Sequence, residues 1–311
     1  MAEAQRIILH HYPMSPFAEK IRLILGAKGV RWSSVLIPVI MPKPDVVALT
    51  GGYRKTPILQ IGADVYCDTA LIADVIETLA PQPTLYPRGV AGASRTLAQW
   101  ADSTLFWTAI PHTMQSAGLA HVFNGAPAEV IQAFAEDRKV FRANLPRMRA
   151  PEAWAGLELY LERLEDLIGG QAFFFGAQPS IADFSVYHCL WFVSRGGPQA
   201  EILKPYRELG AWCERMRGFG HGVHDQLDSA AAIAIAETST PLPSSGISGN
   251  VHGIPAGEKV VIAATDTGID PIEGELYGET RERISIARTD RRAGRVVVHF
   301  PRLGFELRRL M

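Results

Sequence analysis

The sequence is short of cysteine, and it has no long apolar run and no N-terminal targeting pattern. Its three cysteines, Cys67, Cys189 and Cys213, show neither CxxC nor metal-ligand spacing, so we expect reduced thiols in a reducing compartment. Polar residues interrupt each apolar stretch well before the ~20 residues that a transmembrane helix needs. The opening segment, MAEAQRIILHHYP, lacks the basic and apolar regions of a secretory signal. These absences favour a cytoplasmic protein that does not enter a membrane.

A large net charge is missing as well. The formal net charge of −1 over 311 residues leaves no whole-molecule field that would attract nucleic acid or an acidic membrane. One segment departs from this balance, because residues 281–311 hold nine arginines against three acidic residues. That segment has no tyrosine or tryptophan, and only two phenylalanines, for stacking on bases. The composition therefore disfavours a nucleic-acid partner, and we expect the segment to pack against the rest of the chain or a partner subunit.

Apolar periodicity divides the first part of the chain into short strands and helices. Strands are expected at residues 6–10, 32–38, 56–61 and 65–67, and helices at residues 15–29 and 68–80. In the first helix, Ser15 takes the N-cap position, Pro16 the first helical position and Gly29 the position after the end. The proline-rich residues 38–44 cannot continue any element and should form a loop. The order β-α-β followed by β-β-α suits a small mixed sheet with helices on its faces.

The rest of the chain changes character twice. After a linker at residues 81–92, only helical patterns appear up to residue 236. The clearest of these helices cover residues 128–141, 151–168, 181–193 and 206–216. Residues 238–249 have the composition of a flexible linker. Strands are then expected at residues 259–264, 283–288 and 295–300. We thus expect an α/β domain over residues 1–82, an all-helical domain over 90–236 and a small β-rich extension over 250–311.

The stretch from Tyr12 to Arg22 places the Ser15 hydroxyl where a strand meets the first turn of a helix. A helix N-terminus offers unpaired N–H groups and a partial positive charge, which stabilise an anion such as a thiolate. Lowering a thiol pKa by about two units from its usual value of about 8.5 requires roughly 2.7 kcal/mol of interaction that favours the thiolate. A serine hydroxyl that donates to the sulfur is one source of such interaction. An N-cap without a chemical role fits Ser15 equally well.

Two further dipeptides, Thr56–Pro57 and Asp68–Thr69, are candidates to bind a ligand beside this motif. Pro57 follows a glycine-rich turn and precedes a strand, and a cis bond there would turn the N–H and C=O of Thr56 outward, toward a peptide-like ligand. Asp68 and Thr69 open the next helix, where the Thr69 hydroxyl and free N–H groups suit a carboxylate and Asp68 suits an amino group. Together they would hold both ends of an amino-acid moiety. Taken singly, each is more simply explained as a turn proline or a helix cap.

The sequences SPFAEKIR, KTPILQIG and DTALIADVIE, in this order and spacing, resemble the N-terminal domain of the glutathione S-transferase superfamily. The likeness around Ser15 is close to omega-like members, which carry cysteine at that place, whereas serine-type members carry serine. Ser180 and Asp183 resemble a helix cap of the transferase C-terminal domain, whose role there is in folding. The resemblance spans residues 6–225. It implies a thioredoxin-like first domain, an all-helical second domain and a homodimer.

The resemblance also assigns roles by position. It implies that Ser15 activates the thiol of glutathione, the co-substrate. It implies that Thr56 and a cis Pro57 align the backbone of the tripeptide. Asp68 and Thr69 would bind the γ-glutamyl end, although the family usually has a Glu/Gln-Ser pair there. No metal is expected.

The remaining roles are less well defined by position. Either Lys43 or Arg54 would meet the glycine carboxylate, and the sequence does not choose between them. Because Ser15 is not a cysteine, it forms no mixed disulfide, which disfavours redox cycling through that residue. Cys67 falls in an expected hairpin strand and is interpreted as a core thiol.

Several aromatic and histidine residues are weaker candidates. In the family the acceptor pocket lies between the domains, and Phe106, Trp107 and His112 are candidates to line it, although aromatics at this spacing more often belong to a core. His221 and His224 flank a glycine and lack a nearby thiol, so we interpret them as a solvated loop rather than a metal site.

Three functions therefore stay open, because a fold does not fix a function. The first is transfer of glutathione to a hydrophobic electrophile with Ser15 stabilising the thiolate. The second is a glutathione-binding regulator or scaffold that acts through its extension. The third is a glutathione-dependent lyase or isomerase.

Overall fold

The computed structural model describes residues 6–142, 148–248 and 251–310. Within them, ten strands join into one sheet in the order β10-β6-β7-β8-β9-β4-β3-β1-β2-β5. The strands are β1 (Ile7–His11), β2 (Trp32–Leu36), β3 (Ile58–Ile61), β4 (Asp64–Cys67), β5 (His224–Gln226), β6 (Lys259–Ala264), β7 (Ile272–Glu279), β8 (Arg283–Asp290), β9 (Gly294–Pro301) and β10 (Phe305–Arg309). The α-helices are α1 (Pro16–Ala27), α2 (Pro44–Thr50), α3 (Thr69–Leu79), α4 (Ala91–Trp100), α5 (Phe106–Thr113), α6 (Ser116–Val122), α7 (Ala128–Phe141), α8 (Ala150–Ile168), α9 (Ile181–Ser194), α10 (Arg207–Arg217) and α11 (Ser229–Thr238). A π-helical turn, η1 (Ala101–Leu105), and a 3-10 helix, η2 (Gly197–Leu203), complete them.

The N-terminal part of the sheet carries helices on both faces. β1 pairs with β2 in parallel and with β3 antiparallel, and β3 and β4 form a hairpin. Because successive side chains of a strand point to opposite faces, Leu9 joins the apolar core that contains α1 and α3. Its neighbour Ile8 joins the core that contains α2 and α11. The expected thioredoxin-like order is confirmed, and α2 is an addition that directly follows the predicted loop at residues 38–44.

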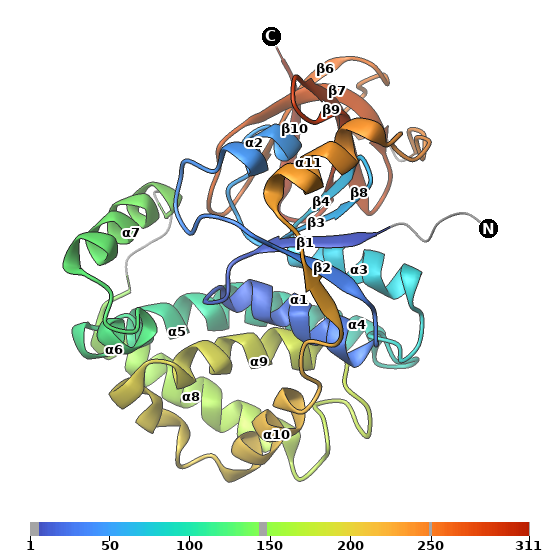
Figure 1. The fold of residues 1–311 in the computed structure, drawn as a ribbon. Helices are drawn as coiled ribbons and strands as arrows, with labels where there is room; N and C mark the ends of the chain where they lie inside the picture. Colours follow the sequence, from blue (N-terminus) through green and yellow to red (C-terminus); the bar gives the residue numbers. More distant parts are fainter. Residues whose placement is uncertain (1–5, 143–147, 249–250, 311) are drawn as a thin grey trace.

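Helices α4 to α10 form the second unit, most of which lies below the sheet in Figure 1, with α7 standing at its left. Its central helix, α9, is buried along most of its length and packs on α1. Both hydrogen bonds of the capping box between Ser180 and Asp183 are present, and the buried Asp183 also accepts from the Trp212 indole. The four helices expected in this unit match α7, α8, α9 and α10 to within one residue at each end. No helix of the described residues is long and apolar enough to cross a membrane.

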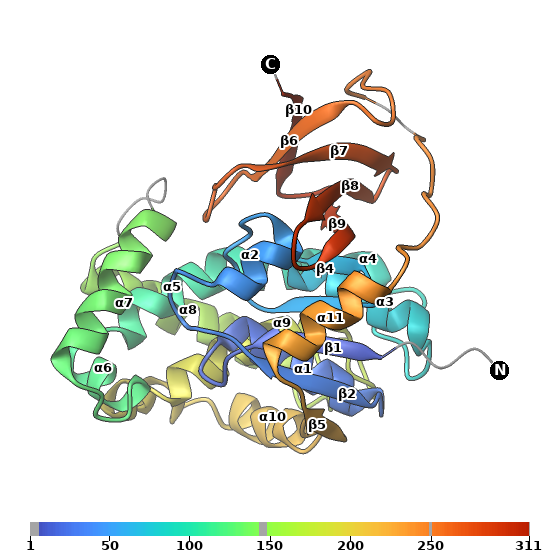
Figure 2. The same ribbon diagram turned by 45° about the horizontal axis from the view of Figure 1, so that its top comes forward.

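Two elements from the region expected to be only helical lie with the sheet rather than with the helical unit, and one of them is a strand. β5 lies beside β2 in parallel, and α11 covers the sheet next to α2 (Figure 2). The expectation of helices alone up to residue 236 is therefore wrong at residues 224–226. The physical reason is that β5 is a short, exposed, polar segment, and only the backbone of β2 gives it a strand conformation.

The extension continues the thioredoxin-like sheet. β9 pairs in parallel with β4, so strands β6 to β10 and the strands of the first domain form one continuous sheet. The three strands expected here are present as β6, β8 and β9, whereas β7 and β10 were not expected. Of the expected linker at residues 238–249, Thr238 instead ends α11, and Gly249 lies outside the described residues.

A polar link ties the extension to β4. His299 places Nδ1 2.8 Å from Ser285 Oγ and Nε2 2.8 Å from Asp64 Oδ1. Burial, which outweighs the attraction of Asp64, lowers the pKa of His299. The order serine, histidine, aspartate is that of a hydrolase triad, but all three residues are no more than 5% exposed. We therefore interpret them as a structural link rather than a catalytic group.

Candidate functional site

The predicted site residues lie together at adjacent ends of three inner strands, β1, β3 and β4. This end of the three strands is called the site edge of the sheet. His10, near the end of β1, pairs with Ile58 at the start of β3, and Ile58 pairs in turn with Cys67 at the end of β4. Antiparallel pairing therefore places the segment that leaves β1, the segment that enters β3 and the segment that leaves β4 side by side. Ser15, Thr56–Pro57 and Asp68–Thr69 lie on these three segments.

Ser15 is the N-cap of α1, as expected. Its backbone is extended, its side chain is 2% exposed, and Oγ accepts from the Ala18 N–H at 3.2 Å. Pro16 occupies the first turn, where its missing N–H costs no hydrogen bond. The next residue, Phe17, packs edge-on against Phe106 of the helical unit, with ring centroids 4.7 Å apart. The Ser15 hydroxyl thus sits at a helix N-terminus that faces the junction of the two units.

Thr56 and Pro57 are joined by a cis peptide bond. Among the described residues, neither the N–H nor the C=O of Thr56 makes a backbone hydrogen bond. The Thr56 hydroxyl accepts from Lys43 Nζ at 3.3 Å, and the same ammonium lies 5.5 Å from the centre of the Tyr12 ring. The main-chain groups of Thr56 are therefore free to pair with an extended ligand.

Lys43 is a buried cation at this edge. Its side chain is 2% exposed, and within the described residues it forms no ion pair. Burial, reinforced by the charge of Arg138 and, more weakly, Arg54, lowers the pKa of Lys43 to about 8, while Asp137 acts against this shift. An uncompensated buried ammonium costs free energy, and an anionic ligand group would offset that cost.

Asp68 has an unusual backbone. Its φ of 76° and ψ of 136° lie in a region that L-residues rarely adopt, at a cost of about 1–3 kcal/mol. The Asp68 carboxylate caps α3 by accepting from the Ala70 N–H at 2.9 Å. Burial raises the pKa of Asp68, opposed by that hydrogen bond and by the charges of Lys55 and Lys20. Such a conformation persists only where neighbouring contacts hold it, and it is typical of ligand-binding positions.

Thr69 connects the site to a buried ionic chain that the sequence did not reveal. Lys20 Nζ donates to Thr69 Oγ1 at 3.2 Å and to Asp102 Oδ2 at 2.6 Å, and Asp102 Oδ1 lies 2.9 Å from His188 Nε2. Burial acts to raise the pKa of Asp102, but the attraction of Lys20 and His188 prevails and lowers it to about 2. Asp102 lies in η1, and π-helical turns of this kind are frequent at functional sites.

The two cations just before Thr56 are engaged by the extension. Arg54 Nε lies 3.3 Å from Asp270 Oδ2, and Lys55 Nζ lies 2.6 Å from Asp266 Oδ1. Both acids belong to the loop between β6 and β7. The sequence offered no signal for these contacts, because they join residues more than two hundred positions apart.

Of the weaker candidates, Phe106 packs against Phe17 near Ser15, whereas the three histidines lie elsewhere. His112 is 2% exposed and its Nε2 bonds to the Gln199 carbonyl at 2.9 Å, which places it in the core of the helical unit. His221 bonds to Glu19 at 3.1 Å, and His224 stacks on Trp32 with ring centroids 4.5 Å apart. The described part of the chain contains no cluster of three or more histidine, cysteine or acidic residues suited to a metal.

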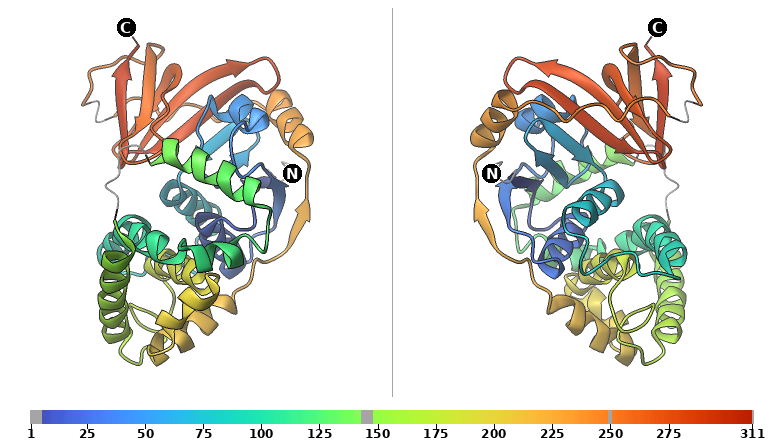
Figure 3. Two further views of the ribbon diagram at one scale, coloured as in Figure 1. Left: turned by 90° about the vertical axis from the view of Figure 1, so that its left-hand side faces the viewer. Right: turned by 90° about the vertical axis from the view of Figure 1, so that its right-hand side faces the viewer.

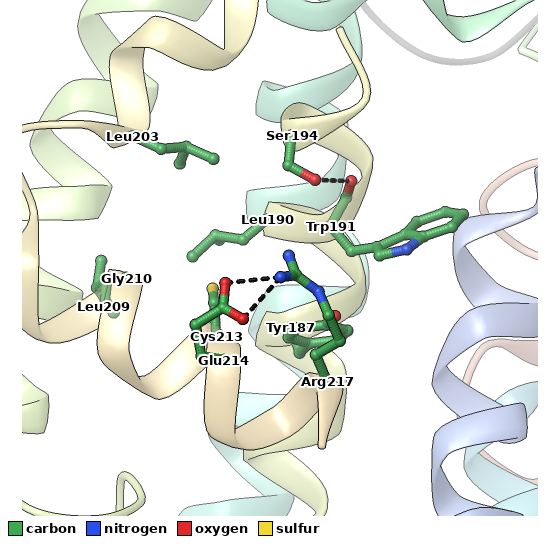
Figure 4. A pocket seen from close by; sticks show the side chains of 10 residues that line it. All are labelled: Tyr187, Leu190, Trp191, Ser194, Leu203, Leu209, Gly210, Cys213, Glu214 and Arg217. Carbon is green, nitrogen blue, oxygen red and sulfur yellow. Dashed lines mark hydrogen bonds and ion pairs between the residues drawn. The ribbon is translucent and has the colours of Figure 1, made fainter. Parts of the chain in front are cut away.

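A cavity of about 160 Å³ lies outside this site, between α9, η2 and α10. Figure 4 shows the residues that line it, with Cys213 beside Glu214, which forms an ion pair with Arg217. Burial raises the pKa of Cys213 to about 12, so this thiol stays protonated. None of the predicted site residues lines the cavity.

Comparison with known proteins agrees with the fold. Residues 9–84 match the glutathione S-transferase N-terminal domain, and residues 132–215 match the glutathione S-transferase C-terminal domain. The crystal structure of a GST-like protein from Pseudomonas syringae is 46% identical, with a TM-score of 0.79, and the match covers 98% of this chain and 100% of that one. The chain therefore belongs to the glutathione S-transferase superfamily, and its extension is shared with that relative.

Two more distant relatives match about two thirds of the chain. Pyrimidodiazepine synthase of Drosophila melanogaster is 25% identical over 221 residues, which make up 68% of this chain and 77% of that protein. A glutathione S-transferase from Rhodospirillum rubrum is 18% identical, with a TM-score of 0.53, over 68% of this chain and 87% of that one. The latter likeness concerns the fold alone.

Proposed function

We propose that the protein is a glutathione transferase that activates the thiol of glutathione at Ser15 and transfers the glutathionyl group to a hydrophobic electrophile. The observation that carries this proposal is the convergence, at one sheet edge, of the α1 N-terminus, the free main chain of Thr56 and the α3 N-terminus. These three elements offer an anion site, a peptide-pairing edge and a second anion site.

The tripeptide would lie along this edge in one direction. Its γ-glutamyl carboxylate would bind at Thr69 and the first N–H groups of α3, with its amino group at Asp68. Its cysteine backbone would pair with Thr56 beside Pro57, which places the sulfur at Ser15. Its glycine carboxylate would lie near the buried Lys43 ammonium.

The chemistry that follows is nucleophilic attack by the bound thiolate. The Ser15 hydroxyl donates a hydrogen bond to the sulfur, and the α1 N-terminus adds its partial positive charge. The thiolate forms the new C–S bond as the leaving group departs from the electrophile with the electron pair. Ser15 contributes no covalent bond, and the neighbouring Cys67 thiol is buried with a pKa raised well above its usual value, so neither residue supports a mixed disulfide.

Homodimer formation and a cytoplasmic location belong to the same proposal, and both are expected from the family. A glutathione-dependent lyase or isomerase would use the same activated sulfur. The name of the fly relative, pyrimidodiazepine synthase, widens the range of electrophiles that should be tried. A regulatory or scaffold role is the second candidate, and the observation that favours it is the continuous β4–β9 pairing of the extension.

The test compares Ser15→Ala with the wild-type protein in glutathione calorimetry and in turnover of activated aryl halides. We expect kcat at pH 7 to fall by about three- to twenty-fivefold, because a bound thiol pKa raised by one to two units lowers the share of thiolate. The Kd for glutathione should change less than about fivefold, because the tripeptide contacts remain. Asp228→Ala is the matched control, since the Asp228 side chain caps α11 by accepting from the Ala231 N–H at 2.7 Å, away from the site. Equal turnover in wild type and Ser15→Ala would refute the catalytic role.

A further inference from the structure

The loop between β6 and β7, residues 265–271, reaches from the extension to the segment that precedes Thr56. Asp270 contacts Arg54 there, and Asp266 contacts Lys55. In the same loop, the Gly268 N–H donates to the Phe141 carbonyl at the end of α7, at 3.0 Å. Figure 3 shows α7, in green, crossing from the helical unit toward the N-terminal domain and the extension. The extension thus contacts the border of the proposed glutathione site from outside the two-domain body.

Gly268 lies against Phe141 and Arg54 in this loop. It has a φ of +57°, and a Cβ there would lie 3.2 Å from the Phe141 ring and 3.3 Å from Arg54 Cγ. A side chain at residue 268 would therefore crowd both neighbours and also strain the backbone. The loop is fitted closely against Arg54.

One nitrogen of the Arg54 guanidinium has an acidic partner, and another has none. Its side chain is 12% exposed, and Nε faces Asp270 at 3.3 Å. Its Nη1 is buried and has no hydrogen-bond partner among the described residues. A buried guanidinium donor without a partner costs free energy, so such atoms are rare unless a ligand or water completes them. Lys43 reaches the same segment, because its Nζ donates to the hydroxyl of Thr56, two residues after Arg54. The charge of Arg54 also contributes to the lowered pKa of Lys43.

We propose that Asp270 is a positioning residue for glutathione: by holding Arg54 through Nε, it leaves Nη1 directed at the glycine carboxylate, beside Lys43. This inference rests on the proposed function. It gives the extension a part in ligand recognition, because an aspartate of the extension orients a cation of the thioredoxin-like domain. A planar guanidinium held by one edge presents its remaining donors in a fixed direction, which a flexible ammonium does not do.

The test uses a ligand that lacks the glycine. γ-Glutamylcysteine keeps the contacts proposed for the γ-glutamyl end and the sulfur of glutathione, but its carboxylate lies on the cysteine, one residue short of the glycine carboxylate. We expect Asp270→Asn to raise the Kd for glutathione about tenfold, as loss of one oriented charge-assisted hydrogen bond would. The Kd for γ-glutamylcysteine should change less than twofold. Asp266→Asn removes the same charge from the same loop, but its partner Lys55 is not the open donor, so both Kd values should stay within twofold.

A second set of variants separates positioning from folding. Arg54→Lys keeps the positive charge but loses the planar guanidinium, so the Kd for glutathione should rise about tenfold. Adding Asp270→Asn to that variant should change this Kd less than twofold. Thermal unfolding monitors the fold, and Arg54→Lys carries the test if Asp270→Asn does not fold. Equal effects on both ligands, or no effect on glutathione in a folded variant, would overturn the inference. Failure of the wild-type protein to bind either ligand would instead refute the proposed function.

Discussion

Asp102→Asn tests the buried ionic chain that joins the two units. Asp102 lies in η1 of the helical unit, Lys20 lies in α1 of the thioredoxin-like domain, and their side chains are 19% and 1% exposed. Removing one partner of a buried ion pair costs about 3–5 kcal/mol, because the other charge stays buried. Since asparagine still accepts a hydrogen bond, we expect the free energy of unfolding to fall by about 3 kcal/mol at pH 7.

The pH dependence gives a second, independent reading of the same pair. The pKa of Asp102 is about 2 in the folded protein and 3.8 ordinarily. This contributes about 2 kcal/mol of stability, fully present above pH 4 and lost as pH falls toward 2. The difference in free energy of unfolding between wild type and Asp102→Asn should therefore be about 1 kcal/mol smaller at pH 3 than at pH 7.

Urea unfolding at pH 7 and pH 3 measures both quantities. Glu201→Gln is the control, because its ion pair with Lys204 is exposed at 63% and 71% and contributes no more than about 1 kcal/mol. A variant within about 1 kcal/mol of wild type at pH 7 would refute the reasoning. A difference in free energy of unfolding that is as large at pH 3 as at pH 7, or larger, would also refute it.

The remaining predictions concern Lys43 and His10. Because the pKa of Lys43 is about 8, binding of S-methylglutathione, which has no thiol to titrate, should weaken about fourfold more in wild type than in Lys43→Gln between pH 7 and pH 8.5. Equal pH profiles from calorimetry would exclude Lys43 from the site. Burial lowers the pKa of His10 from 6.5 to about 4. As pH falls, His10 is therefore protonated in the unfolded chain before it is protonated in the folded protein. The free energy of unfolding should fall by about 3 kcal/mol as pH drops from 6.5 to 4. His10→Asn should reduce that loss, and identical slopes in urea titrations would contradict the assignment.

The parts of the fold that local sequence specifies were predictable. Ser15, Pro16 and Gly29 mark both ends of α1 by their own conformational preferences. The end of α7 at residue 141 follows equally from local periodicity. The positions of Thr56 and Asp68 at one sheet edge also follow, because the hairpin order fixes which strand ends are adjacent.

The parts that depend on distant contacts were not predictable. β5 is a strand only because β2 pairs with it, and β7 contains glycine and glutamate residues that obscure its alternation. Asp102 stands in a polar stretch that resembles a solvated helix face, and only the fold brings it to Lys20. Asp270 likewise has meaning only beside Arg54. Such contacts leave no local pattern in the sequence.

The most direct test of the central claim is the pKa of the glutathione thiol when bound, measured from its thiolate ultraviolet absorbance in wild type and Ser15→Ala. We predict a bound thiol pKa about two units below the usual value of about 8.5 in wild type, and a rise of at least one unit in Ser15→Ala. A bound thiol that titrates near 8.5 in the wild-type protein, or no binding at millimolar glutathione, would contradict the account.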